Sequence, residues 1–331
     1  MIRSFFGVLF RAVPKGDSQI GERRIGSAAG ARFPVKIARG MGGLPAGGIK
    51  KGGGRGYASR PPGGKRKSMA RFCPLCSGSS GNSAYVGSAE GGVLVDAGAS
   101  CKAILTALAQ REIPLKAIGG ILITHEHVDH IKGLKVLLKK LPIPVFGPEK
   151  SMEYLAQNDL VPPGADLNPL PSLGFDLGEL YIEHFETSHD SLGSAGYRIY
   201  TPDERKIGIA TDLGYVSQEV HAGISGCDLV LLESNYDEGM LITSPYPYSL
   251  KRRIKGNMGH LSNDFCACEA KELVKTGTTR VVLGHLSKEN NLPQLAYETI
   301  RGTLEEAGCR LGEDYLLSVA PRCDPGEMMI L

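Results

Sequence analysis

The chain has 331 residues, of which 42% are hydrophobic and 22% are charged, which is enough apolar material for one large domain or two small ones. No segment approaches the run of about 18 apolar residues that a membrane-spanning helix needs, which excludes a protein with such helices. Residues 1–68 carry 15 Lys and Arg against two acidic residues, whereas residues 69–331 carry 23 against 33. The net charge of +3 therefore conceals a basic leader and an acidic body.

The leader, residues 1–68, is rich in Gly, Arg and Lys and lacks sustained periodicity. Such a segment buries too little apolar surface to offset the entropy of ordering, so we predict that it is disordered. Its start, MIRSFFGVLFRAV, resembles an organelle transit peptide, and KKGGGRGYASRPPGGKRK is typical of a nucleic-acid-binding arm. A third explanation, which we favour, is a start codon assigned too early, because patterned sequence begins directly after Met69. We therefore expect one domain over residues 69–331, with a leader that need not belong to the mature protein.

The eight cysteines are scattered along the chain. Cys73 and Cys76 have the spacing of half a zinc ribbon, but no second CxxC accompanies them, so we interpret them as thiols of an opening strand. No secretory signal is recognisable, which favours reduced thiols and a cytoplasmic location. A transit peptide in the leader would instead direct the protein to an organelle.

Strand-like and helical patterns alternate after Met69. Short apolar runs predict strands near residues 72–76, 83–87, 92–96, 119–124, 180–185, 195–200, 206–211, 227–233, 280–284 and 315–319. Helical spacing, with Ser100 and Ser262 as N-caps, predicts helices near residues 101–112, 131–138, 263–275 and 294–307. Early strands cluster as in hairpins and later ones alternate with helices. This order predicts an α/β fold in which helices cover both outer faces of two packed sheets, a four-layer αββα sandwich.

Three histidines and an aspartate lie within six residues of the segment ILITHEHVDHIKGL. The segment joins an apolar run that predicts a buried strand to a helical pattern, and a loop at such a junction can turn several side chains toward one point. Neutral imidazoles bind Zn²⁺ well, and a carboxylate adds charge compensation. The candidate ligands here are His125, His127, Asp129 and His130. A tetrahedral ion has four ligands, and some of them would come from other parts of the chain. Four candidates in one short segment are therefore too many for a single ion, which favours two adjacent ions.

Short motifs continue from Phe72 to Asn291, namely FCPLCSGSSGNSAYV, VLVDAGAS, THEHVDH, TSHDS, IGIATDLGY, LLESNYDEGML, GHLSND and GHLSKENN. With these motifs in this order, the body resembles the metallo-β-lactamase fold superfamily, and within it the WalJ/YycJ group. The resemblance covers most of residues 69–331 and does not extend to the leader. It implies the αββα sandwich and a site with two divalent ions, Zn²⁺ or Mn²⁺.

The resemblance also implies a role for each candidate ligand. The ligands implied for the first ion are His125, His127 and His189. The ligands implied for the second ion are Asp129, His130 and His285. Asp212 would bridge both ions, and Asp96 would orient the cluster from behind, because ligating histidines usually need a carboxylate or carbonyl partner. Other interpretations stay open, since a strand-end aspartate such as Asp212 can cap a turn and His189 can be a surface loop residue.

Asp129 and His260 are the candidate catalytic residues. Two ions about 3.5–4 Å apart would lower the pKa of a shared water and hold a phosphate oxygen, and the leaving oxygen would then need a proton. Phosphodiesterases of the superfamily have a non-ligand histidine some two dozen residues before the last metal ligand, and His260 precedes His285 by 25 positions. The alternative is that His260 is a structural residue ahead of a helix start.

Four residues are candidate substrate contacts. Ser79 and Asn82 belong to a glycine-rich turn whose amides would meet a phosphate, and Arg252 lies in a basic run at residues 251–255. Asn290 follows the last candidate ligand, where it would either support His285 or contact the substrate. Because the body is acidic, binding of a nucleic acid would depend on a local basic groove.

The resemblance implies a dinuclear metal-dependent phosphodiesterase, most specifically a 5′-to-3′ DNA exonuclease acting in DNA repair or replication. Only 72 residues separate Asp212 from His285, too few for the domain that larger nucleases of the superfamily insert there, so the DNA-binding surface must be built differently. Two alternatives remain: a small-molecule metallohydrolase for a cyclic phosphodiester or a thioester, and a non-catalytic regulator of a cell-wall two-component system. The resemblance implies DNA as the substrate. A homodimer stays open, since the sequence does not identify the oligomeric state, and we expect no membrane partner.

Overall fold

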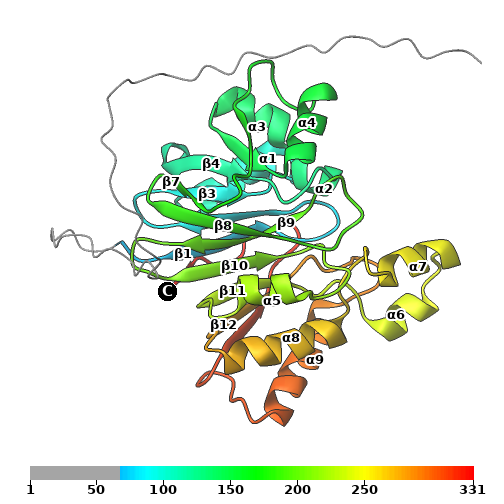
Figure 1. Ribbon diagram of the computed structural model, residues 1–331. Coiled ribbons are helices and arrows are strands. Elements are labelled where there is room, and N and C mark those ends of the chain that lie inside the picture. Colours follow the sequence, from blue (N-terminus) through cyan, green and yellow to red (C-terminus); the bar gives the residue numbers. More distant parts are fainter. Residues whose placement is uncertain (1–67) are drawn as a thin grey trace, which may run out of the picture. The chain divides into compact units, whose positions relative to one another are not determined.

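The computed structural model describes residues 68–331, which contain two seven-stranded sheets (Figure 1). The strands of the first sheet, in spatial order, are β14 (Met329–Ile330), β1 (Arg71–Cys76), β2 (Ser83–Gly87), β3 (Gly92–Val95), β4 (Ile118–Leu122), β5 (Val145–Gly147) and β6 (Leu167–Pro169). Those of the second sheet are β13 (Leu316–Val319), β12 (Arg280–Gly284), β11 (Leu229–Glu233), β10 (Lys206–Ala210), β9 (Ala195–Tyr200), β8 (Leu180–Glu186) and β7 (Phe175–Leu177). Each sheet is part parallel and part antiparallel.

Helices cover the outer face of each sheet (Figure 1). Those on the first sheet are α1 (Cys101–Gln110), α3 (Leu134–Lys140) and α4 (Glu149–Gln157). Those on the second sheet are α5 (Gln218–Ile224), α8 (Asn263–Lys275) and α9 (Pro293–Glu306). A 3₁₀ turn, η1 (Leu115–Ala117), precedes β4, and the short helix α2 (Val128–Ile131) follows it. The layers are therefore helix, sheet, sheet and helix.

Three apolar clusters separate these four layers, and the alternation of side chains along the strands explains them. In β3, Val93 and Val95 face the core between the two sheets, whereas Leu94 faces the helices of the first sheet. In β11, Leu231 faces the core between the sheets and Leu232 faces the helices of the second sheet. Strands that are covered on both faces need apolar residues at every position, which is why their sequences read as continuous apolar runs.

The predicted αββα sandwich is confirmed, with three local differences. The helix predicted near 131–138 is divided into α2 and α3 at Gly133, whose N–H donates to the Ala97 carbonyl at 2.8 Å. A Cβ at Gly133 would lie 2.1 Å from the Ala99 carbonyl oxygen, so only glycine allows this approach. The sequence predicts neither the short strands β5, β6, β7 and β14 nor the helices α4, α5, α6 (Glu238–Thr243) and α7 (Tyr248–Lys255), because these segments are brief or polar. The predicted leader lies outside the described residues, apart from Ser68.

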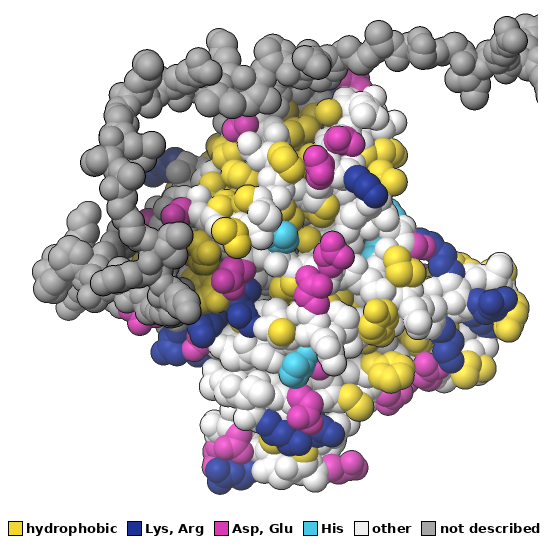
Figure 2. Space-filling view, viewed as in Figure 1, with side chains coloured by type: hydrophobic (Ala, Val, Ile, Leu, Met, Phe, Trp, Pro, Cys, Tyr) yellow, Lys and Arg dark blue, Asp and Glu magenta, His cyan; other side chains and the backbone are white. Residues whose placement is uncertain are grey.

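Helices α6 (Glu238–Thr243) and α7 (Tyr248–Lys255) project from the body between β11 and α8 (Figure 1). No side chain of α7 is fully buried. In Figure 2 this projecting part carries Lys and Arg side chains together with hydrophobic ones. No helix in residues 68–331 has the length and apolar content needed to cross a membrane.

Thiol reactivity tests the packing of the first strand and of α8. Cys73, Cys76 and Cys266 are buried, whereas Cys268 and Cys323 are exposed. Burial raises the pKa of Cys73 to about 11 and that of Cys76 to about 12, which leaves little reactive thiolate at neutral pH. We expect iodoacetamide to modify Cys268 and Cys323 in the native protein and the buried thiols only after unfolding, as read by peptide mass spectrometry. Fast labelling of Cys73 in the native protein would contradict this packing.

Candidate metal centre

The candidate ligands gather where parallel strands end. β3 and β4 are parallel neighbours in the first sheet, and Asp96 and His125 follow them. β10, β11 and β12 are parallel neighbours in the second sheet, and Asp212 and His285 follow β10 and β12. Carboxyl ends of parallel strands meet at one edge, so residues distant in sequence come together. His189 joins them from the loop between β8 and β9.

Ligand-type atoms from these loops form four overlapping groups, in each of which the atoms lie within 4.8 Å of one another. The first group is His125, His127 and His189, and the second is Asp129, His130 and His285. These are the two sets that the resemblance implies. Asp212 belongs to a third group with His125 and His130, one residue from each set. The structure therefore brings all seven predicted ligands to one place, with Asp212 between the two sets.

The donor set fits divalent cations. The Nε2 atom of His125 and the Oδ2 atom of Asp212 are buried without a hydrogen-bond partner among the described residues. The ring of His125 lies only 4.6, 4.2 and 4.9 Å, between centroids, from the rings of His127, His130 and His189. Buried polar atoms are normally paired, and a divalent cation would pair these two. Burial and the neighbouring histidines lower the pKa of His125 well below its usual value, which keeps its lone pairs available.

Hydrogen bonds at Nδ1 orient three of the imidazoles. His130 Nδ1 lies 2.7 Å from Asp96 Oδ2, which is the role that the resemblance implies for Asp96. His189 Nδ1 donates to the Gly259 carbonyl at 3.0 Å, and His285 Nδ1 lies 2.9 Å from Glu233 Oε1. Because each Nδ1 carries the proton, each Nε2 is left as the lone-pair donor.

Glu233, the last residue of β11, received no role from the sequence, although it occupies a strand end like Asp96. Its Oε1 accepts from both His260 Nδ1 at 2.8 Å and His285 Nδ1 at 2.9 Å, and its Oε2 accepts from the Leu213 N–H at 2.6 Å. Burial disfavours the carboxylate, but the two histidines outweigh it and lower the pKa of Glu233 to about 2. A glutamate that ends an apolar strand is the signal that would have identified it.

Backbone packing fixes the loop that carries Asp129. The Asp129 carbonyl accepts from the Asn82 N–H at 2.8 Å. A Cβ at Gly98 would lie 1.6 Å from the same carbonyl oxygen, so Gly98 is required for this close approach. The Asn82 side chain lies 3.2 Å from His130 Nε2 and 3.4 Å from Asp129 Oδ2. Asn82 therefore contacts the candidate ligands themselves.

The predicted substrate contacts differ in how far they are exposed. Ser79 and Arg252 are exposed, and Arg252 lies on the projecting helix α7. Asn290 is 1% exposed and is hydrogen-bonded to Ser287, so it has almost no surface to offer a substrate. Glu126, inside the histidine motif, is also buried and accepts from the Ser151 hydroxyl at 2.7 Å, which ties the motif to α4.

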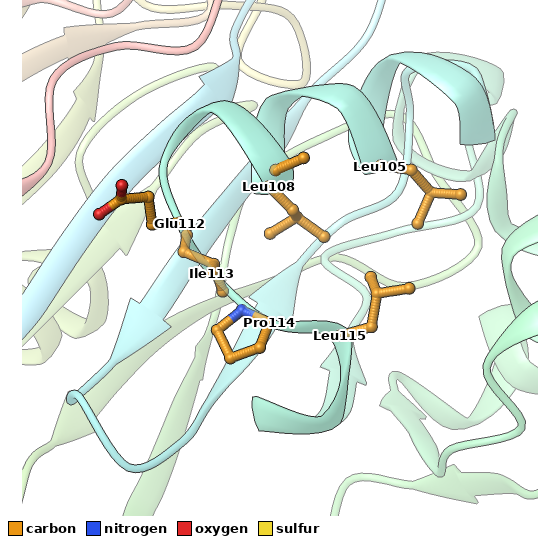
Figure 3. Close-up of a pocket in the computed structure, with 7 residues that line it drawn as sticks. Leu105, Leu108, Glu112, Ile113, Pro114 and Leu115 are labelled. Atoms are coloured by element: carbon orange, nitrogen blue, oxygen red, sulfur yellow. The ribbon is translucent and has the colours of Figure 1, made fainter.

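A surface cavity of about 430 Å³ lies elsewhere, beside α1 and η1 (Figure 3). It is lined mainly by apolar side chains, among them Leu105, Leu108 and Leu115, and its lining includes no histidine. It is therefore separate from the metal centre.

A family profile described as "Beta-lactamase superfamily domain" matches residues 92–286, the segment that runs from β3 to just past His285. The chain belongs to this family, the metallo-β-lactamase superfamily.

Relatives within the family are similar over almost their whole length. The exodeoxyribonuclease YycJ of Bacillus anthracis is 39% identical over 249 residues, which cover 74% of this chain and 92% of the relative. The exodeoxyribonuclease WalJ of Streptococcus pneumoniae is 35% identical over 251 residues, with the same coverage. The crystal structure of the metallo-β-lactamase fold protein YhfI from Bacillus subtilis matches 78% of this chain and 99% of its own, with a TM-score of 0.58 and 16% identity. This structural likeness concerns the fold.

Replacing Glu233 tests its support of the metal centre. Glutamine has one acceptor oxygen, whereas Glu233 accepts at both oxygens, so Glu233→Gln must leave either the two histidines or the Leu213 N–H without an acceptor. We expect metal affinity to fall about 10–100-fold, as measured by competition with a metal indicator. The matched control is Glu269→Gln, which alters a carboxylate 2.8 Å from His221 outside the candidate ligand groups. Equal affinities of the two variants would refute this role.

Proposed function

We propose that the chain is a dinuclear metal-dependent phosphodiesterase that removes nucleotides from DNA in the 5′-to-3′ direction. The observation that carries the proposal is the pair of ligand groups with Asp212 between them. The relatives named exodeoxyribonucleases, which the chain matches over 92% of their length, support DNA as the substrate. The presence of Asp129, a carboxylate beside the imidazoles, suits ions that bind phosphate oxygens.

The residues that would hold the ions are those of the two groups. His125, His127 and His189 would hold one ion, Asp129, His130 and His285 the other, and Asp212 would contact both. When bound, Zn²⁺ or Mn²⁺ would supply Lewis acidity, lowering the pKa of water and stabilising charge on phosphate oxygens.

His260 would supply a proton to the leaving oxygen, and its surroundings support this role. Its Nδ1 is held by Glu233 at 2.8 Å, so Nε2 is the free ring nitrogen, and the side chain is 21% exposed. A buried carboxylate at Nδ1 fixes the orientation of the ring, which a general acid needs. His260 Nδ1 also lies 3.8 Å from Asp212 Oδ1, which places the ring at the edge of the ligand groups.

Nucleotide release from end-labelled DNA tests the proposed function. With Mn²⁺, we expect the full chain to release mononucleotides from the 5′ end and His127→Ala to abolish release, because His127 belongs to a ligand group. His184→Ala is the matched control, because His184 bonds the Pro171 carbonyl and belongs to no ligand group. Bis-p-nitrophenyl phosphate and nitrocefin serve as comparison substrates. Turnover of the small diester without any attack on DNA would contradict the exonuclease.

Replacing His260 separates proton donation from metal binding. We expect His260→Ala to lower turnover on DNA by about 10²–10⁴-fold, the usual contribution of a general acid, with metal content near that of the wild type. Elemental analysis of the purified variant provides the second measurement. Because His260 also groups with Asp212, Glu233 and His285, a variant that lost its metal would show that His260 is a ligand instead.

A further inference from the structure

Thr124 lies in the loop directly after β4, next to the histidine motif, and its side chain is buried at the metal centre. Its hydroxyl oxygen, Oγ1, lies 2.9 Å from Asp96 Oδ2 and 3.1 Å from His125 Nδ1. The neighbours of this hydroxyl are therefore the carboxylate that orients His130 and an imidazole of the other ligand group.

The donors and acceptors around Thr124 fit one arrangement of protons. A hydroxyl donates one proton and accepts at its lone pairs, whereas a carboxylate only accepts, so Thr124 donates to Asp96. The Thr124 oxygen then accepts from His125, which places the proton of His125 on Nδ1. The Nε2 atom of His125 is left with its lone pair, and this is the atom that is buried without a partner among the described residues.

His130 receives its orientation from Asp96 directly. Its Nδ1 lies 2.7 Å from Asp96 Oδ2 and 3.1 Å from the Thr124 hydroxyl, so the carboxylate is the closer acceptor. The Thr124 oxygen therefore remains available as the acceptor for His125.

Both sheets hold Thr124 in place. Its N–H donates to Asp96 Oδ1 at 2.8 Å, behind β3 of the first sheet. Its carbonyl accepts from the N–H of Ala195, the first residue of β9 in the second sheet, at 3.0 Å. Because a β-branched side chain has few rotamers, the fixed backbone also fixes the hydroxyl. The position of the hydroxyl is thus set before any ion binds.

His125 depends on this hydroxyl more than its neighbours do. Its side chain is buried, and within residues 68–331 Thr124 is the only group hydrogen-bonded to it. A buried N–H without an acceptor costs free energy. Without the hydroxyl, the proton of His125 is better placed on Nε2, because Asp212 offers an acceptor within the same ligand group. A proton on Nε2 would occupy the lone pair that an ion needs.

We propose that Thr124 is a positioning residue through which Asp96 orients His125 as well as His130. One buried carboxylate then orients one imidazole of each ligand group, His125 of the first and His130 of the second. Loss of the hydroxyl releases His125 and leaves the direct bond between Asp96 and His130 intact. The proposal rests on the metal centre of the proposed function and adds a residue to its support.

Stepwise metal binding tests this proposal. The metal-free full chain is titrated with Co²⁺, whose visible absorption reports its ligands, in competition with a chelator. Thr124→Val replaces the hydroxyl by a methyl group of similar size. We expect the wild type to bind two equivalents. We expect the variant to bind one of them with wild-type affinity and the other about 10–100-fold more weakly, the usual cost of losing the support behind a ligand.

Matched variants identify the cause of the loss. Thr124→Ser keeps the hydroxyl and should restore both affinities. Thr278→Val is the control, because Thr278 is equally buried but its hydroxyl has no hydrogen-bond partner among the described residues, and it should bind both ions like the wild type. Two wild-type affinities in Thr124→Val would overturn the proposal. Equal weakening of both ions would overturn it too, because it would show a general support of the centre.

Nitrogen NMR of the metal-free protein, with ¹⁵N-labelled histidine, reads the position of the proton itself. We expect the His125 proton on Nδ1 in the wild type and in Thr124→Ser, and on Nε2 in Thr124→Val. Thr124→Ala removes the same hydroxyl with less bulk and takes the place of the valine variant if that one does not fold. A proton that stays on Nδ1 without the hydroxyl would refute the role of Thr124.

These measurements need no DNA, so they separate this proposal from the function on which it rests. Selective loss of one ion by Thr124→Val, in a protein whose wild type releases no nucleotides, would retain the role of Thr124 and refute the exonuclease. Nucleotide release by a Thr124→Val variant that binds both ions like the wild type would retain the exonuclease and refute the role of Thr124.

Discussion

Two buried carboxylates, one from each sheet, orient the imidazoles on which the metal centre depends. Asp96 follows β3 of the first sheet and holds His130, and Glu233 ends β11 of the second sheet and holds His260 and His285. Each carboxylate is hydrogen-bonded to the Nδ1 atom of its histidine. The Nε2 atom of each ring therefore points away from the carboxylate. The proposed proton donor His260 and the candidate ligand His285 thus share one acceptor in Glu233, which couples their positions.

This arrangement requires strained backbone at the strand ends. Asp96, Asp212 and His285 have φ values of 62°, 60° and 54°, a conformation that costs a residue other than glycine about 1–3 kcal/mol. Hydrogen bonds hold it in place: the His285 N–H donates to Ser77 Oγ at 2.8 Å, and the Asn235 side chain donates to the His285 carbonyl at 2.7 Å. The strain turns each side chain out of its strand direction and toward the shared edge, which is how residues from both sheets reach one point.

The sequence predicted the layers and the histidine loop because both depend on local patterns. Apolar runs identify strands that are covered on both faces, and the motif at residues 125–130 places four candidate ligands together without any tertiary information. Glu233 could not be identified in this way, since its partners His260 and His285 lie 27 and 52 residues further along the chain. Asn290 shows the same limit, because its position after a candidate ligand left support of His285 and substrate contact both open, and only the fold reveals its burial.

The projecting helices α6 and α7 and the exposed loop residues Tyr215 and Met258 could not be predicted, because periodicity does not report exposure. A tyrosine or methionine near a ligand usually packs in the core, and Tyr215 and Met258 differ from that expectation only through the loops that hold them outward. These two loops carry Asp212 and His260, and each is hydrogen-bonded to the loop of His189, through Gly214 N–H to the Ser188 carbonyl and through Asp190 N–H to the Met258 carbonyl. The geometry of the ligands therefore depends on several loops at once, and a substitution that displaced one loop would also displace the ligands of the next.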